Sequence, residues 1–181
     1  MKGSLIAVVG PSGVGKDSVM EGMVRACPDL MLVQRVITRE AGAGGEDFEH
    51  VSEAEFHDRV HDGAFALHWQ AHGLFYGVPR EITAALSSGT SLLVNLSRAV
   101  LPEAQMLFPG FCVLHLTAPR EVLAQRLADR GRESADVIDL RLERAGFELP
   151  EGLRQVIEIA NTGMIDETVE QALSALHLPR G

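Results

Sequence analysis

Eight consecutive residues, Gly10 to Asp17, form the clearest chemical pattern in the chain and have the sequence G-P-S-G-V-G-K-D. They follow an apolar run and precede a segment of helical pattern, an order that is typical of a phosphate-binding loop. Glycines let the backbone amides wrap round a phosphate, while the helix N-terminus and Lys16 add positive charge near the β- and γ-phosphates. The alternative, a glycine turn with a solvated lysine, leaves the eight-residue match unexplained. We therefore expect a nucleoside triphosphate to be bound by Gly10, Pro11, Ser12, Gly13, Val14, Gly15, Lys16, Asp17 and Ser18.

Asp17 occupies the position after the lysine, where phosphate loops usually have a Ser or Thr whose hydroxyl binds Mg²⁺. A carboxylate is also a good oxygen ligand for this cation, either directly or through a water molecule. We hypothesise that Asp17 supports Mg²⁺, with Ser18 as a lesser candidate. In the alternative, Asp17 only stabilises the helix N-terminus electrostatically. Both interpretations stay open at this stage.

Composition limits the possible partners. The formal net charge of −9 over 181 residues argues against general binding to nucleic acid or to a membrane surface. Cys27 and Cys112 stand apart without metal-binding spacing, which is typical of reduced core cysteines in a cytosolic protein. No segment approaches ~20 consecutive apolar residues, and the N-terminal apolar run does not have the length or flanks of a signal peptide. We expect a soluble, cytoplasmic protein that acts on a small molecule, and the oligomeric state stays open.

Apolar runs and helical patterns alternate along the chain, which favours a mostly parallel sheet with helices on both faces. The two short strands near Gly73 indicate a small β insertion, and Ser52 with Glu55 predicts a capping box at a helix start. Pro79 is predicted to begin a helix, because proline is favourable at a first helical position. Strands are predicted at 4–9, 31–37, 64–70, 74–77, 91–96, 111–116 and 155–159. Helices are predicted at 18–24, 52–62, 98–107, 119–130, 135–147 and 165–176, and a loop at 38–50.

Five of the sixteen basic residues of this acidic chain crowd residues 126–144: Arg126, Arg130, Arg132, Arg141 and Arg144. Arg126 and Arg130 are four residues apart, so a helix would place them on one face. Phosphoryl transfer requires cations that offset the charge of the transferring group in a dry site, and a basic lid would supply them. The alternative is an exposed face on which these arginines pair with Glu133 and Glu143. With a phosphate loop upstream, we favour the lid.

Arg35 and Arg39 flank the end of the second predicted strand. Ligands of open α/β sheets bind beyond the carboxyl ends of the strands, so we expect the second substrate here. Arg39 and Tyr76, the only tyrosine, could hold an acceptor phosphate through charge-assisted hydrogen bonds. Alternatively, Arg39 pairs on the surface with Glu40 or Glu46.

The order of these features resembles the guanylate-kinase family of P-loop kinases over nearly the whole chain. This resemblance implies an α/β fold, a P-loop NTPase three-layer sandwich with a mostly parallel sheet. It further implies a single kinase domain at 1–181, with an acceptor-binding insertion at about 38–78 and a helical lid at about 126–147. Guanylate kinases bind guanine through carboxylates at the positions of Leu67, Asn95 and Ser97. Because a site cannot lose such groups and keep its discrimination, we reject guanine nucleotide as the acceptor. The resemblance rests on residues 10–16, Thr38-Arg39, Gly45-Glu46, Val51-Ser52, Phe56, Phe65, Gly73, Tyr76-Gly77, Arg126-Leu127, Arg130-Gly131 and Arg141-Leu142.

The departures from guanylate kinases resemble a sister family, the ribose 1,5-bisphosphate phosphokinases of phosphonate degradation. The shared segments are G-P-S-G-x-G-K-D at 10–17, Ile37-Thr38-Arg39, G-L-x-Y-G at 73–77, V-N-x-S-R at 94–98, Leu101-Pro102 and R-G-R-E at 130–133. The resemblance implies phosphoryl transfer from ATP, with Mg²⁺, to ribose 1,5-bisphosphate, giving ADP and 5-phospho-α-D-ribose 1-diphosphate (PRPP). It also explains Asp17 as a family feature. The catalytic residues implied are Lys16, Arg126, Arg130 and Arg141, and the acceptor residues are Arg39, Tyr76, Asn95, Ser97 and Arg98.

Two alternatives stay open. The first is a kinase for another small metabolite, including a divergent guanylate kinase, which the phosphate loop alone does not distinguish. The second is a non-catalytic binding module, because guanylate-kinase-like scaffold domains exist. Such modules typically lose the loop lysine and glycines, whereas Lys16 and Gly15 are present here. This feature favours an enzyme.

Overall fold

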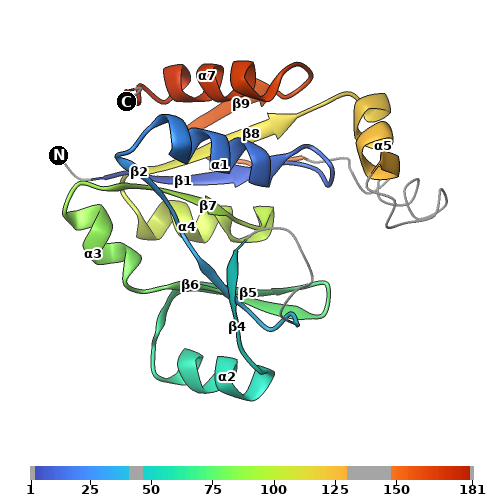
Figure 1. Cartoon of the computed structure of the whole chain (residues 1–181). Coiled ribbons are helices and arrows are strands. Elements are labelled where there is room, and N and C mark those ends of the chain that lie inside the picture. Colours follow the sequence, from blue (N-terminus) through green and yellow to red (C-terminus); the bar gives the residue numbers. More distant parts are fainter. Residues whose placement is uncertain (1–2, 41–46, 130–147, 180–181) are drawn as a thin grey trace.

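The structure is a computed structural model that describes residues 3–40, 47–129 and 148–179. Its main sheet has five strands in the order β2-β7-β1-β8-β9, and every pairing in this sheet is parallel. The strands are β1 (Leu5–Val9), β2 (Leu30–Leu32), β7 (Ser91–Asn95), β8 (Phe111–Thr117) and β9 (Val156–Ala160). Helices α1 (Lys16–Ala26) and α7 (Ile165–Ala175) cover one face, and α3 (Ile82–Ser87) and α4 (Leu101–Leu107) cover the other (Figure 1). The predicted α/β three-layer arrangement is confirmed.

β1 shows why the main sheet is covered on both faces, because all five of its residues are buried. Successive side chains of a strand point to opposite faces. Ile6 and Val8 belong to the core formed with α1 and α7. Leu5, Ala7 and Val9 belong to the opposite core, which includes residues of α3 and α4. A parallel strand buried in this way appears in the sequence as a continuous apolar run, which is the pattern that predicted it.

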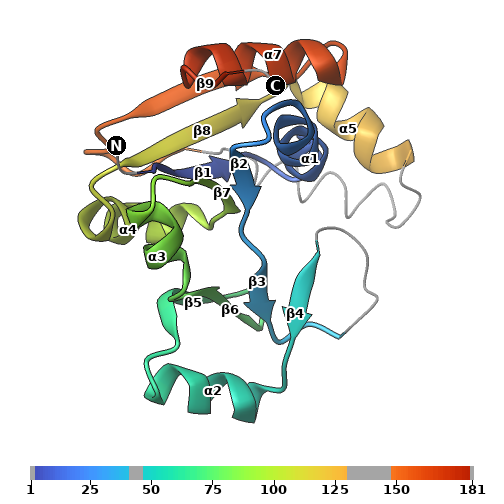
Figure 2. The same cartoon turned by 60° about the vertical axis from the view of Figure 1, so that its left-hand side comes forward.

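A second sheet has four strands in the order β4-β3-β6-β5 (Figure 2). Its strands are β3 (Arg35–Ile37), β4 (Phe48–His50), β5 (Phe65–Ala71) and β6 (Leu74–Pro79). His72 and Gly73 form the two-residue turn of the β5–β6 hairpin, with φ of 53° and 75°. Positive φ at both central residues suits the twist of the flanking strands. The predicted hairpin is therefore confirmed, within a larger sheet than expected.

Helix α2 (Glu53–His61) packs on the second sheet through Phe56, whose ring lies 4.8 Å from that of Phe65 and 5.6 Å from that of Phe75, centroid to centroid. The Ser52 hydroxyl accepts a hydrogen bond from the Glu55 N–H at 3.2 Å. This contact is the N-cap half of the predicted capping box, and it satisfies one of the donors that a helix start leaves open.

The single strand predicted at 31–37 is wrong, because the chain changes sheets within it. β2 pairs with β7 in the main sheet, whereas β3 pairs with β4 and β6 in the second. The N–H of Val33 still donates to the Leu93 carbonyl at 2.8 Å, and after Gln34 the chain continues into the second sheet (Figure 2). An apolar run does not reveal this change, because each half is buried by different partners. The predicted loop at 38–50 is wrong at its end, where β4 pairs in parallel with β3.

Pro79 does not begin a helix. It is the last residue of β6, opposite Phe65, and α3 begins at Ile82. Proline is tolerated at such a strand end when no ladder N–H is required there. The helix predicted at 98–107 begins instead as a short 3₁₀ turn, η1 (Arg98–Val100), before α4.

Helix α5 (Arg120–Asp129) matches the helix predicted at 119–130 up to the last described residue. The helix predicted at 135–147 lies outside the described residues, as does most of the predicted lid. Across 3–40, 47–129 and 148–179, no helix is long and apolar enough to cross a membrane.

Candidate active site

The phosphate loop joins β1 to α1 and has the geometry that its glycines predict. Gly15 has φ of 90°, in the left-handed region where other residues are strained. A Cβ atom at this position would also lie 2.9 Å from Nδ2 of Asn161, so both conformation and space favour glycine. Lys16 is the first residue of α1, and its ammonium donates to the carbonyl oxygens of Gly10 at 2.9 Å and Pro11 at 3.3 Å. The lysine therefore lies back across the loop.

Asn161 follows β9 and supports the loop from behind. It is 3% exposed, and its Nδ2 donates to the Val14 carbonyl at 2.7 Å while its Oδ1 accepts from the Thr168 hydroxyl at 2.8 Å. Arg126 also donates to the Val14 carbonyl, from Nη1 at 3.4 Å. Sequence reasoning missed Asn161 and Thr168. A polar pair seven residues apart acquires this meaning only once α7 has packed beside β9.

A cavity of about 850 Å³ opens beside the loop, between the two sheets. Its walls come from the phosphate loop, the start of β3, the β5–β6 hairpin and the chain around the carboxyl end of β7. The lining residues are Gly10, Pro11, Ser12, Lys16, Arg35, Trp69, Ala71, His72, Tyr76, Asn95, Leu96, Ser97 and Arg98. The fold thus brings the phosphate loop and one part of the second sheet to a common site.

The structure brings together four of the five predicted acceptor residues, since Tyr76, Asn95, Ser97 and Arg98 all line this cavity. Asn95 is the last residue of β7, and the Ser97 hydroxyl accepts from the Ala99 N–H at 3.4 Å at the start of η1. The fifth, Arg39, is not among the lining residues. Its guanidinium carbon lies 4.5 Å from the ring centroid of Phe48.

Arg35 and Trp69 also line the cavity, although no acceptor role was predicted for either. Arg35 is 5% exposed, and burial lowers its pKa to about 10, against the favourable influence of Tyr76 and Asp17 on its charge. Trp69 pairs with Tyr76 across the β5–β6 hairpin. The alternation of β5 could have placed Trp69 on one face of the strand, but only the pairing with β6 and β3 shows that this face borders the cavity.

The structure describes some of the remaining predicted site residues and not others. Asp17 lies in the first turn of α1, beside Lys16. In the described ranges, no group of three or more His, Cys, Asp or Glu side chains could hold a metal ion on its own. The carboxylate of Asp17 is a hard oxygen ligand of the kind that suits Mg²⁺, a cation that usually takes its other ligands from substrate phosphates and water. Arg126 is placed beside the loop, whereas Arg130 and Arg141 lie outside the described residues.

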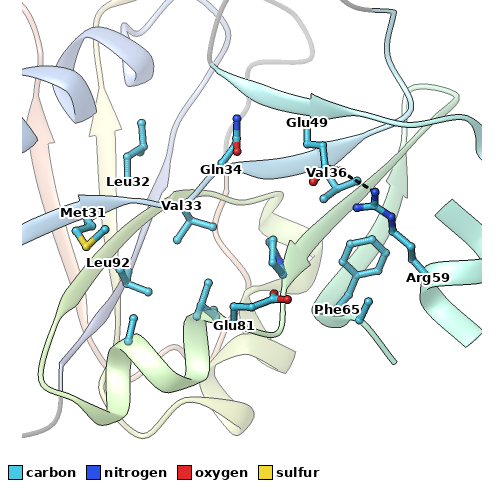
Figure 3. A pocket seen from close by; sticks show the side chains of 14 residues that line it. Met31, Leu32, Val33, Gln34, Val36, Glu49, Arg59, Phe65, Glu81 and Leu92 are labelled. Carbon is cyan, nitrogen blue, oxygen red and sulfur yellow. Dashed lines mark hydrogen bonds and ion pairs between the residues drawn. The ribbon is translucent and has the colours of Figure 1, made fainter. Parts of the chain in front are cut away.

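A second cavity, of about 450 Å³, lies where the chain passes from one sheet to the other (Figure 3). Val33, Gln34 and Pro79 from these crossings are among its lining residues. An ion pair at 2.7 Å between Arg59 and Glu49 also contributes to its wall. Its lining contains no phosphate-loop residue, so it does not form part of the candidate active site.

No family model matches the chain. The ribose 1,5-bisphosphate phosphokinase PhnN of Ruegeria sp. (strain TM1040) is 54% identical over 179 residues, which cover 99% of this chain and 94% of that protein. The chain belongs to the ribose 1,5-bisphosphate phosphokinase family. A second PhnN phosphokinase, from Brucella melitensis biotype 2 (strain ATCC 23457), is 42% identical over 180 residues, 97% of this chain and 93% of its own.

As a member of the phosphokinase family, the chain is an enzyme of the kinase class, and its phosphate loop serves a nucleotide substrate. The alternative of a non-catalytic binding module is therefore wrong. The fold resembles that of the guanylate kinase from Anaplasma phagocytophilum, with a TM-score of 0.69 over 97% of this chain and 85% of that chain. Sequence identity to that structure is 20%, so this similarity concerns the fold alone.

Proposed function

We propose that this phosphokinase transfers the γ-phosphoryl group of ATP to ribose 1,5-bisphosphate, producing ADP and PRPP. The observation on which the proposal rests is the shared cavity, whose lining includes Lys16 of the phosphate loop and a set of polar acceptor-side residues. The names of relatives up to 54% identical support the choice of acceptor. We place the reaction in the cytoplasm and in phosphonate metabolism, as an ATP-dependent source of PRPP.

The chemistry of the acceptor suits a site without a strong base. A sugar phosphate has a second pKa near ~6, so at pH 7 its oxygen is already an ionised nucleophile. In the proposed step, an oxygen of the 1-phosphate attacks the γ-phosphorus of ATP and forms a new P–O bond. The bond from the γ-phosphorus to the β–γ bridging oxygen breaks, and ADP leaves with that electron pair. The main obstacle is repulsion between two polyanions, which cations in a dry site reduce.

Lys16 and the loop amides are proposed to bind the β- and γ-phosphates, and Asp17, with Ser18 nearby, to support Mg²⁺. When bound, Mg²⁺ would offset negative charge on the phosphate oxygens. On the acceptor side, Arg98 would supply positive charge to the sugar phosphate, and the side chains of Tyr76, Asn95 and Ser97 would form hydrogen bonds with it. The Nη1 of Arg98 already donates to the Glu148 carbonyl at 3.5 Å. Arg39 is kept as a candidate for binding the acceptor. Because it is not among the residues that line the cavity, its side chain would have to move toward the cavity to do so.

We propose that residues 1–181 act as one kinase domain, in which about 38–78 receive the acceptor and about 126–147 form the lid. Arg126 is the described member of the proposed lid, and its contact with the Val14 carbonyl supports a position at the nucleotide end of the site. Arg130 and Arg141 are proposed to offset the charge of the transferring group together with Arg126.

Guanine nucleotide is a poor fit to this site. Leu67, at the position where guanylate kinases have a base-binding carboxylate, is 1% exposed and packs in the core that includes Val78. Asn95 and Ser97, which replace the other acidic residues, do line the cavity, but they offer hydrogen bonds without a negative charge. Since neutral side chains repel an anionic sugar phosphate less than carboxylates do, these replacements favour a more highly charged acceptor.

An acceptor panel tests the proposal. ADP release would be followed with Mg·ATP and, in separate reactions, ribose 1,5-bisphosphate, ribose 5-phosphate, GMP and gluconate. We expect kcat/KM for ribose 1,5-bisphosphate to exceed the others by at least about 10²-fold, because loss of paired polar contacts costs several kcal/mol. Preference for GMP would identify a divergent guanylate kinase, and preference for another compound would identify a different metabolite kinase. Either result would overturn the proposed acceptor.

A further inference from the structure

Arg35, Trp69 and Tyr76 form a compact cluster, here called the Arg35 cluster, in the wall of the 850 Å³ cavity. The two rings stack with centroids 5.2 Å apart and planes 5° from parallel. The guanidinium carbon of Arg35 lies 5.2 Å from the Tyr76 centroid and 5.7 Å from the Trp69 centroid. Both distances are within the range of cation–π contact.

The strand pairing explains this arrangement. Trp69 and Tyr76 are directly opposite each other in the antiparallel β5–β6 pair, and β3 lies on the other side of β6. The neighbour of Arg35, Val36, pairs with Gly77. Ile37, which pairs with Tyr76, is two positions after Arg35 and therefore lies on the same face of β3 as Arg35. The register of three strands therefore fixes a cation and two aromatic rings beside the phosphate loop.

The cluster keeps a positive charge almost entirely out of water, because Arg35 is 5% exposed and Trp69 9% exposed. Burial lowers the pKa of Arg35 to about 10, Tyr76 and Asp17 favour the charged form, and Arg39 opposes it. The group is thus protonated at pH 7. A guanidinium in cation–π contact with aromatic rings can still donate hydrogen bonds from its N–H groups, and the oxygens of a phosphate match the spacing of these donors.

We propose that Arg35 is a specificity-determining residue of the acceptor site, which binds a phosphate group of the sugar phosphate while Trp69 and Tyr76 hold its guanidinium plane. This inference rests on the proposed function, because it names a residue for that function's acceptor. The inference names a different arginine from the sequence-based prediction, which chose Arg39. Arg35 lines the cavity, whereas Arg39 does not. Lysine cannot replace Arg35, since a point charge lacks the planar, bidentate donor edge.

The cluster provides its own reporter, because Trp69 is the only tryptophan of the chain. Its fluorescence would be titrated with ribose 1,5-bisphosphate, and separately with ribose 5-phosphate and inorganic phosphate, in the wild type, Arg35→Lys and Arg35→Gln. Arg25→Gln is the matched control, because Arg25 is an exposed residue in the last turn of α1. Steady-state kinetics on the same proteins would give KM for the acceptor and for ATP.

We expect Arg35→Lys and Arg35→Gln to raise the acceptor Kd obtained from the fluorescence titration at least about tenfold, and to raise the acceptor KM by a similar factor. A change of this size is the effect of losing a hydrogen bond to a charged group. The ATP KM should stay within about twofold, and Arg25→Gln should match the wild type. A folded Arg35 variant with the wild-type acceptor affinity would refute the inference. If both variants fail to fold, the ring-shifted Nε–H resonance of Arg35 in the wild type decides, because it must move when the sugar phosphate binds.

The proposed function and the role of Arg35 can fail separately. Arg35-dependent binding of ribose 5-phosphate or inorganic phosphate, without turnover of ribose 1,5-bisphosphate, would overturn the proposed acceptor and support the phosphate-binding role of Arg35. Turnover of ribose 1,5-bisphosphate that is unchanged in the Arg35 variants would support the proposed acceptor and refute the phosphate-binding role of Arg35.

Discussion

Asn161→Ala should loosen the phosphate loop and destabilise the whole protein. The substitution removes the hydrogen bonds to the Val14 carbonyl at 2.7 Å and from the Thr168 hydroxyl at 2.8 Å. Asn161 and Thr168 are 3% and 2% exposed, so water cannot readily replace what is lost. Each buried polar group left unsatisfied costs about 1–3 kcal/mol. Because Arg126 also donates to Val14, we expect a total of about 2–4 kcal/mol in the free energy of unfolding.

Urea unfolding followed by Trp69 fluorescence would measure this loss in the free energy of unfolding. In thermal unfolding, Tm should fall by roughly 5–15 °C for a chain of this length. The ATP KM should rise several-fold, because the loop amides lose their support. Thr168→Val removes only one of the two bonds and should cost about 1 kcal/mol, whereas Thr168→Ser keeps the hydroxyl and serves as the matched control. A loss below about 0.5 kcal/mol for Asn161→Ala, with an unchanged ATP KM, would refute the idea that Asn161 holds the loop.

Three further predictions concern the loop and the core. Lys16→Ala should lower kcat by at least about 10²-fold with Tm nearly unchanged, because the lost charge acts on the transferring phosphates; near-normal turnover would contradict the mechanism. Asp17→Ala should raise the Mg²⁺ concentration needed for half-maximal rate, and an unchanged Mg²⁺ dependence would leave Asp17 with only an electrostatic role at the helix start. Burial raises the pKa of Cys112 from 9.0 to about 11, so its thiol should react with a disulfide reagent at pH 8 only after unfolding. Because the unfolded thiol ionises first, the stability that the neutral thiol contributes should decline as pH rises from about 9 towards 11; rapid labelling of the native protein at pH 8 would be inconsistent with its burial.

The features that sequence reasoning predicted correctly are those encoded locally. The phosphate loop is one continuous segment whose glycines dictate its backbone, and β1 is an apolar run whose length and flanks match a buried strand. The capping residue Ser52 and the hairpin around Gly73 likewise depend on neighbours within a few positions. Asn95 and Ser97 were predicted from the resemblance to the phosphokinase family; the structure places both in the wall of the 850 Å³ cavity, and their role toward the acceptor stays a prediction.

The features that were missed depend on contacts between distant segments. The change of sheet after Val33 is set by β7 on one side and by β4 and β6 on the other. Asn161 reaches the loop from 147 positions away. Trp69 and Arg35 become neighbours only through the strand order of the second sheet. No local periodicity specifies such pairings, and for the same reason the sequence alone did not indicate that Arg35 borders the cavity.

The most direct test of the central claim is phosphorus NMR of the purified protein with Mg·ATP and ribose 1,5-bisphosphate, beside a matched sample with GMP. We predict a new diphosphate signal on the sugar, ADP in equal amount, and no reaction of GMP. GDP formation at a comparable rate would contradict the account, because it would mean that the replacements at Leu67 and Ser97 do not exclude guanine nucleotide. ATP binding without product in either tube would refute ribose 1,5-bisphosphate as the acceptor.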